Sequence, residues 1–238
     1  MKKLLFLLLF TISSSFAQNQ ALAVDYLENR DYEKAVAIFE ELYAQNQNNQ
    51  VVFLGLIACY SELKQFDIAE KIILQKEKTN NSPYLIVERA YLWELQNQKP
   101  KAEALYQEAV NAISVNANMS YAVARAFETK GLIDWVIKSY EKGKEVNPEL
   151  NIDYQIALLE GQRGNTGVMA DKLLDYAFNN QWQTARVQNN LTFFMSNESN
   201  STFSDYLRKS LLIRTQKTPN TYWNQFLSWF FVQNEQYD

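Results

Sequence analysis

The sequence contains no histidine and only one cysteine, Cys59, among its 238 residues. Without histidine it cannot build a Ser-His-Asp triad, histidine acid–base chemistry or nearly any catalytic zinc site. One cysteine excludes an intrachain disulfide and a cysteine metal cluster. We therefore expect a chain that is not an enzyme, with no catalytic residue, no cofactor and no metal site.

Glycine and proline are also scarce, with 6 and 4 residues where average usage gives about 17 and 12. An all-β chain needs many such residues in its tight turns, so their scarcity favours helices. Basic residues are slightly outnumbered, 23 Lys and Arg against 27 Asp and Glu. This balance lacks the basic excess with which proteins bind nucleic acid, so we expect no nucleic-acid partner.

Long hydrophobic runs are confined to the first residues of the chain. Lys2 and Lys3 precede an apolar run over 4–10, and the small residues Ser15 and Ala17 follow it. This order is typical of a secretory signal peptide that is cleaved after Ala17, so residues 1–17 are not part of the predicted fold. The run is too short to span a bilayer, which needs about 20 residues. Cleavage would remove both lysines and change the net charge from −4 to −6. We expect an exported protein without an integral membrane span, located in a bacterial periplasm.

Internal repeats organise the rest of the chain. A set of hydrophobic and small residues recurs 34 positions later: Leu22, Tyr26, Tyr32, Ala35 and Phe39 correspond to Leu56, Tyr60, Phe66, Ala69 and Ile73. A second set does the same: Trp93, Ala102, Tyr106 and Ala109 correspond to Phe127, Val136, Tyr140 and Gly143. A period of 34 residues indicates an array of helix–turn–helix units.

With these residues the chain resembles the tetratricopeptide repeat family. The resemblance covers residues 18–182 as five repeats, at 18–49, 50–82, 83–116, 117–150 and 151–182. It implies an all-α, right-handed superhelical solenoid of antiparallel helix pairs. Residues 183–238 resemble degenerate repeat helices and end in one unpaired helix. That helix, from Thr221 to Asn234, is strongly apolar, so we expect the natural chain to continue past Asp238.

The repeat pattern also assigns packing roles. Small residues let the two helices of a pair approach closely: Ala35, Ala69, Ala102 and Ala170. Aromatic residues fill the space between repeats: Tyr26, Tyr60, Trp93 and Phe127. Turns within the pairs are expected at 29–31, 97–99, 130–131 and 164–165. The glycines between Gly161 and Gly167 are interpreted as a helix end and turn, because a phosphate loop requires a preceding strand. Cys59 is interpreted as a buried, unreactive thiol.

In the family the first helices of the pairs line the concave surface, so their outward stripe is a candidate binding groove. In the second and third repeats this stripe is largely apolar and aromatic. The site residues that we predict in the second to fourth repeats are Leu54, Tyr84, Val87, Tyr91 and Tyr121, with Arg125 as the charged contact. A helix that is apolar on all sides is either buried or presents a binding surface. The sequence alone does not decide whether the stripe packs on another part of the chain or binds a partner. Because the stripe carries little charge, binding there is expected to depend little on salt.

These features predict a periplasmic interaction scaffold that binds protein or peptide partners and is accessory to envelope assembly or secretion. The signal-peptide end and the abundance of Asn, Gln and Lys look like those of Bacteroidetes envelope proteins. One alternative is the docking arm of an enzyme whose catalytic domain lies beyond residue 238. Another is a structural module that self-associates through its apolar end.

Overall fold

The computed structural model describes residues 16–197, 202–217 and 220–234. Residues 1–15 of the predicted signal peptide lie outside this part, whereas Phe16 and Ala17 begin its first helix. Residues 198–201 of the expected polar loop and residues 218–219 of the expected helix break also lie outside it.

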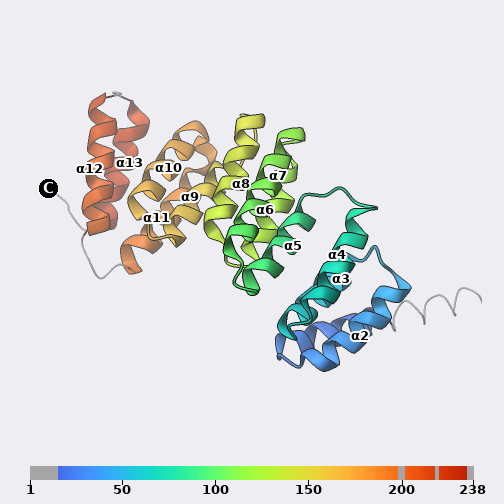
Figure 1. Cartoon of the computed structure of the whole chain (residues 1–238). Coiled ribbons are helices and arrows are strands. Elements are labelled where there is room, and N and C mark those ends of the chain that lie inside the picture. The colour runs from blue at the N-terminus through green and yellow to red at the C-terminus, as the bar shows by residue number, and fades with distance from the viewer. Residues whose placement is uncertain (1–15, 198–201, 218–219, 235–238) are drawn as a thin grey trace, which may run out of the picture. The chain divides into compact units, whose positions relative to one another are not determined.

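All regular structure in the described ranges is helical, which confirms the predicted all-α class (Figure 1). A helix over residues 16–28 comes first. It is followed by α2 (Tyr32–Gln45), α3 (Gln50–Glu62), α4 (Phe66–Glu77), α5 (Tyr84–Leu95), α6 (Lys99–Ala112), η1 (Ile113–Val115), α7 (Met119–Glu128), α8 (Ile133–Val146), α9 (Asp153–Gln162), α10 (Thr166–Asn179), η2 (Gln181–Gln183), α11 (Thr184–Asn197), α12 (Thr202–Lys217) and α13 (Thr221–Gln233). None of the described helices is long and apolar enough to cross a membrane.

The chain forms two compact units, which we call the N-terminal unit (Met1–Ala126) and the C-terminal unit (Phe127–Asp238). Their boundary falls inside α7. In the N-terminal unit α2 packs against α3, α5 packs against α6, and α4 contacts both α3 and α5. In the C-terminal unit α9 packs against α10, and α12 packs against both α10 and α13. Neighbouring helices in sequence are thus the main packing partners, as expected of a repeat array.

The same turn closes the first helix of five successive pairs. Its central residue has a positive φ, and these residues are spaced 34, 33, 34 and 33 apart: Arg30 (62°), Lys64 (58°), Asn97 (60°), Gly131 (70°) and Gly164 (83°). At Lys64 the Gln65 N–H donates to the Tyr60 carbonyl at 2.8 Å and the Lys64 N–H donates to the Ser61 carbonyl at 3.1 Å. This pair of bonds defines a Schellman helix end. The other four turns repeat both bonds, so the period read from side chains is also a period of the backbone.

Small residues bring the helices of a pair together as predicted. The four repeat alanines, Ala35, Ala69, Ala102 and Ala170, are all buried. Gly55 on α3 has a similar role, because a Cβ there would lie closer than 3.0 Å to the ring of Phe39 on α2. Among the repeat aromatics, Tyr60 and Phe127 are buried, but Trp93 is only half-buried. Trp93 lies at the edge of the packing, where the Lys101 ammonium is 4.5 Å from its ring centre.

The last described helix is well packed, with four of its six aromatic side chains buried. Trp223 of α13 stacks on Phe178 of α10, with the ring centres 5.1 Å apart, and Phe226 and Phe230 are also buried. The exposed side chains of this helix are polar except for Val232: Thr221, Asn224, Gln225, Ser228, Val232 and Gln233. Leu227, Trp229 and Phe231 are partly buried against the core of the C-terminal unit. The aromatic residues recur at intervals of three and four, so they occupy one arc of the helix and leave the other polar.

Candidate interaction face

The six residues predicted to line a groove all lie in the N-terminal unit, on α3, α5 and α7. The structure divides them into two groups. Leu54 and Tyr91 are half-buried and Arg125 is exposed, and Tyr121 keeps 42% of its surface exposed. These four residues keep exposed surface. We use the name interaction face for this set of candidate residues.

Tyr84 and Val87 are buried, with 8% and 0% of their surface exposed. In this structure they pack inside the unit, which is the alternative that the sequence left open for the stripe. The reason is that α5 packs on both α4 and α6, so only a narrow arc of this helix remains uncovered. Tyr84 also has its pKa raised by burial, and to a smaller extent by the Glu88 carboxylate and by the nearby Tyr43.

The surroundings of Tyr91 are acidic. Burial raises the pKa of the Tyr91 phenol, and the carboxylates of Glu94, Glu62 and Glu88 raise it further. Glu94 also accepts a hydrogen bond from the Tyr106 hydroxyl at 2.6 Å. Burial, followed by this bond, raises the pKa of Tyr106 as well. The expectation of a weakly charged stripe is therefore wrong around Tyr91.

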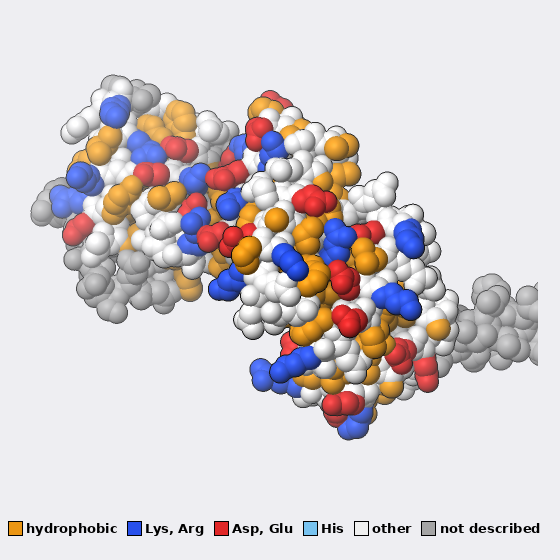
Figure 2. Space-filling view, viewed as in Figure 1, with side chains coloured by type: hydrophobic (Ala, Val, Ile, Leu, Met, Phe, Trp, Pro, Cys, Tyr) orange, Lys and Arg blue, Asp and Glu red, His pale blue; other side chains and the backbone are white. Residues whose placement is uncertain are grey.

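Part of this acidic environment could have been read from the sequence. Glu88 and Glu94 lie three residues before and after Tyr91, and such spacing places side chains on one face of a helix. Glu62 belongs to α3, in a different helix pair, so its approach to Tyr91 depends on packing that no local pattern shows. On the face of the N-terminal unit in view in Figure 2, hydrophobic side chains are interspersed with acidic and basic ones rather than gathered in one patch.

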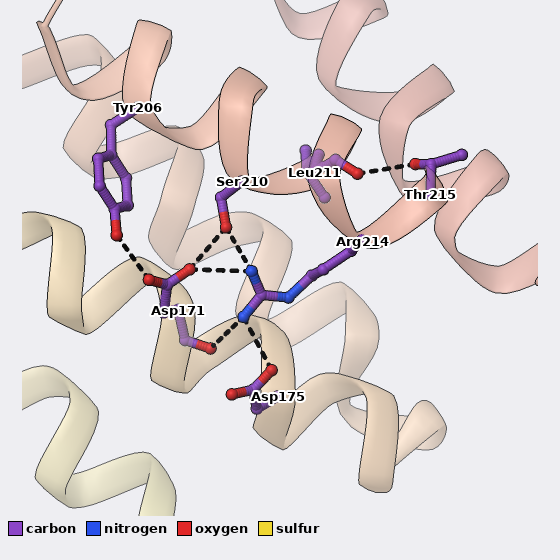
Figure 3. Close-up of polar contacts among 7 residues, drawn as sticks. All are labelled: Asp171, Asp175, Tyr206, Ser210, Leu211, Arg214 and Thr215. Carbon is purple, nitrogen blue, oxygen red and sulfur yellow. Dashed lines mark hydrogen bonds and ion pairs between the residues drawn. The ribbon is translucent and has the colours of Figure 1, made fainter. Parts of the chain in front are cut away.

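A second group of interacting side chains lies in the C-terminal unit, between α10 and α12 (Figure 3). The Asp171 carboxylate accepts hydrogen bonds from the Tyr206 hydroxyl at 2.5 Å, the Ser210 hydroxyl at 2.6 Å and the Arg214 guanidinium at 2.9 Å. Arg214 also contacts the Asp175 carboxylate at 2.8 Å. We call these five residues the Asp171 cluster.

The Asp171 cluster has the properties of a structural clamp. Burial alone would raise the pKa of Asp171, but hydrogen bonds from Ser210 and Tyr206 and the charge of Arg214 lower it below its usual value. The carboxylate is thus held in its charged form by three donors from α12. Asp171 and Arg214 are 43 residues apart, so no motif in the sequence indicated that they meet.

Two other sequence predictions concern chemically notable residues. Cys59 is fully buried, which confirms the predicted burial. Burial raises the pKa of its thiol to about 11, and a raised pKa disfavours the reactive thiolate. Gly164 ends a helix with a positive φ, which confirms the interpretation of the surrounding glycines as a helix end and turn. In the part of the chain that the structure describes, no group of three or more Cys, Asp or Glu residues is placed to hold a metal ion.

Comparison with known proteins gives a family match over about a quarter of the chain. Residues 26–85 match the family model described as "Tetratricopeptide repeat". These residues extend from the helix over residues 16–28 into the start of α5, and they contain the first two of the five turns described above. Arrays of such repeats are protein-interaction scaffolds, whose stacked pairs provide extended binding surfaces. A search of curated proteins finds no match.

A comparison of structures matches the chain to several solved structures. A crystal structure of MamA protein is 15% identical, covers 73% of this chain and 96% of its own, and has a TM-score of 0.36. YrrB, titled a TPR protein with an unusual peptide-binding site, is 12% identical, with coverages of 67% and 83% and a TM-score of 0.33. PilF of Pseudomonas aeruginosa is 9% identical, with coverages of 91% and 98% and a TM-score of 0.38. Identities and TM-scores this low establish neither a shared partner nor a shared site.

Proposed function

We propose, from the tetratricopeptide repeats that this chain carries, that it is an exported scaffold that holds a protein or peptide partner on its interaction face. The observation that carries the proposal is the partial exposure of Leu54, Tyr91 and Tyr121 on three successive first helices. Tyrosines are favoured at interfaces because they bury a large area with few rotatable bonds and keep a polar tip. Arg125 supplies a charged contact beside them.

The signal-peptide pattern supports export, and we include a periplasmic location and an accessory role in envelope assembly or secretion in the proposal. The N-terminal unit is the part that would contact the partner. Its helix pairs hold Leu54, Tyr91 and Tyr121 on helices that are themselves packed, so little side-chain and backbone order has to be created on binding.

Replacement of Tyr91 by alanine tests the proposal. A central aromatic anchor commonly contributes about 2 kcal/mol, so we expect Tyr91→Ala to weaken binding roughly thirtyfold. Binding would be measured by capturing partners from an envelope extract, followed by titration of the captured protein. A crosslinker placed at position 121 should reach the same partner, whereas one placed at the exposed Gln107 of α6 should not.

Trp93→Ala is the matched control, since it removes a half-buried aromatic residue from the same helix, on the side next to Lys101 of α6. We expect it to leave binding unchanged. Circular dichroism of both variants checks that they are folded. If folded Tyr91→Ala binds the partner as the wild type does, or if Trp93→Ala weakens binding equally, the interaction face is assigned wrongly.

A further inference from the structure

Lysine is distributed unevenly between the two kinds of helix in the N-terminal unit. In the part of the unit that the structure describes, the helical lysines lie on the second helices of the pairs, which carry carboxylates as well: Lys34 on α2, Lys71 and Lys76 on α4, and Lys99 and Lys101 on α6. The first helices α3 and α5 have no lysine and carry Glu62, Glu88, Arg89 and Glu94. The arginine is turned toward α4, where its guanidinium contacts the Glu77 carboxylate at 3.3 Å.

The glutamates of these first helices lie close to the interaction face. Glu62, Glu88 and Glu94 all act electrostatically on the Tyr91 phenol. Glu62 is exposed and Glu94 is half-exposed, whereas Glu88 is buried. Glu94 is held in place by the hydrogen bond that it accepts from Tyr106. An exposed carboxylate, Glu62, and a half-exposed one that a hydrogen bond holds in place, Glu94, therefore act on a partly accessible tyrosine.

We infer that the segment held on the interaction face is a cationic peptide, in which lysine or arginine alternates with apolar side chains. The inference rests on the proposed function and specifies the partner of the same face. An ammonium or guanidinium group in the peptide would pair with Glu62 or Glu94. It would also be attracted to the electron-rich face of the Tyr91 ring. The apolar side chains would contact Leu54 and Tyr121.

An acidic partner would be disfavoured at this face. Its carboxylates would approach those of Glu62 and Glu94, and like charges brought together in an interface reduce affinity. Arg125 at the edge of the face would offset only part of this repulsion. The carboxylates of Glu62 and Glu94 thus favour a cationic peptide over an acidic one, while the tyrosines supply the contact area.

The experiment uses the full chain and two fluorescent peptides of about 12 residues with the same leucine and tyrosine content, one rich in lysine and one rich in glutamate. Binding is measured by fluorescence anisotropy at about 0.05 M and about 0.3 M salt. We expect the lysine peptide to bind at least about tenfold more tightly at the lower salt and to lose most of this advantage at the higher salt.

Glu62→Gln combined with Glu94→Gln should remove the preference, while leaving an amide oxygen at position 94 to accept the Tyr106 bond. Glu41→Gln combined with Glu103→Gln is the control, since it removes two exposed carboxylates from second helices of the same unit and should keep the preference. Preference for the glutamate peptide, or a preference that survives in Glu62→Gln/Glu94→Gln, overturns the inference.

The outcome also separates the inference from the proposed function. If both peptides bind equally and Tyr91→Ala weakens both, the face binds peptides but the inferred charge selection is wrong. If neither peptide binds, the proposed interaction face and the inference built on it are both wrong.

Discussion

Three of the five repeated turns have a residue other than glycine at their central position, where the backbone conformation favours glycine. Arg30, Lys64 and Asn97 have φ near +60°, whereas Gly131 and Gly164 occupy the same position in later pairs. For a residue with a Cβ, the left-handed region costs roughly 1 kcal/mol. Arginine and lysine gain nothing locally that offsets this cost, while asparagine is tolerated better.

We therefore predict that Lys64→Gly stabilises the protein, raising its free energy of unfolding by about 0.5–1 kcal/mol in urea titrations. The gain is limited because glycine also makes the unfolded chain more flexible. Lys64→Ala is the control, since it removes the same side chain but keeps a Cβ, and it should give no gain. Equal stabilisation by both variants would mean that the lysine side chain, and not the backbone strain, is unfavourable.

The close contact between Gly55 and Phe39 leads to a second prediction at this scale. A Cβ at position 55 would overlap the ring of Phe39, and this ring has no exposed surface through which to move away. Gly55→Ala should therefore destabilise the N-terminal unit by about 1–3 kcal/mol, although alanine favours helices more than glycine does.

Adding Phe39→Leu provides the check on Gly55→Ala, because a smaller side chain makes room for the new methyl group. In chemical denaturation, the double variant should lose clearly less stability than the sum of the two single variants. Additive losses would show that the two residues do not interact as the structure places them.

At the scale of the helices, the Asp171 cluster joins α10 to α12 through charge-assisted hydrogen bonds. We predict that Asp171→Asn lowers the free energy of unfolding by about 1 kcal/mol at neutral pH. Asp175→Asn should cost less, because Asp175 is 66% exposed and contacts only Arg214 within the cluster. A larger loss for Asp175→Asn than for Asp171→Asn would contradict this account of the clamp.

The pH dependence of the Asp171 cluster gives a further test. The folded pKa of Asp171 is lowered, so its contribution to stability is present above the unfolded value of about 3.9 and is lost as pH falls through the folded value. Thermal unfolding of wild type and Asp171→Asn should thus differ at pH 7, and the difference should begin to shrink near about pH 4 and vanish only once the pH lies below the folded pKa. A difference that stays constant from about pH 7 down to the lowest pH at which both proteins are folded would show that the charge of Asp171 is not what stabilises the clamp.

Much of this helical arrangement could be predicted from the sequence because it is local. The period of 34 residues predicted where the helix pairs lie. Small residues at the same position of successive repeats, such as Ala35 and Ala69, predicted where the two helices of a pair pack closely. The burial of Tyr84 and Val87 could not be predicted, since periodicity gives the face of a helix but not how much of it the neighbours cover. The electrostatic effect of Glu62 on Tyr91 and the ion pair of Arg214 with Asp171 join different helix pairs, which side-chain periodicity does not encode.

At the scale of the whole molecule, the repeat architecture separates stability from recognition. The alanines and aromatic residues that stabilise the pairs lie between helices, so the side chains on the outer arc of the first helices can vary without loss of the fold. Tyr91 and Glu62 lie on this arc, whereas Phe39 and Gly55 lie in the packing. Variants of the interaction face should therefore change partner choice while leaving the unfolding transition of the chain nearly unchanged.

The last prediction concerns the predicted signal peptide. If the first residues are a signal peptide, the exported protein begins at Gln18 and lacks Phe16 and Ala17, the first two residues of the first described helix. Helix ends fray readily, so losing two residues there should not affect the pairing of that helix with α2. Mass spectrometry of protein isolated from the periplasm should show a chain that starts at Gln18. Ala17→Phe should block cleavage and leave the uncut precursor, because the position before the cut requires a small residue. Periplasmic protein that still begins with Met1 would contradict the signal-peptide assignment.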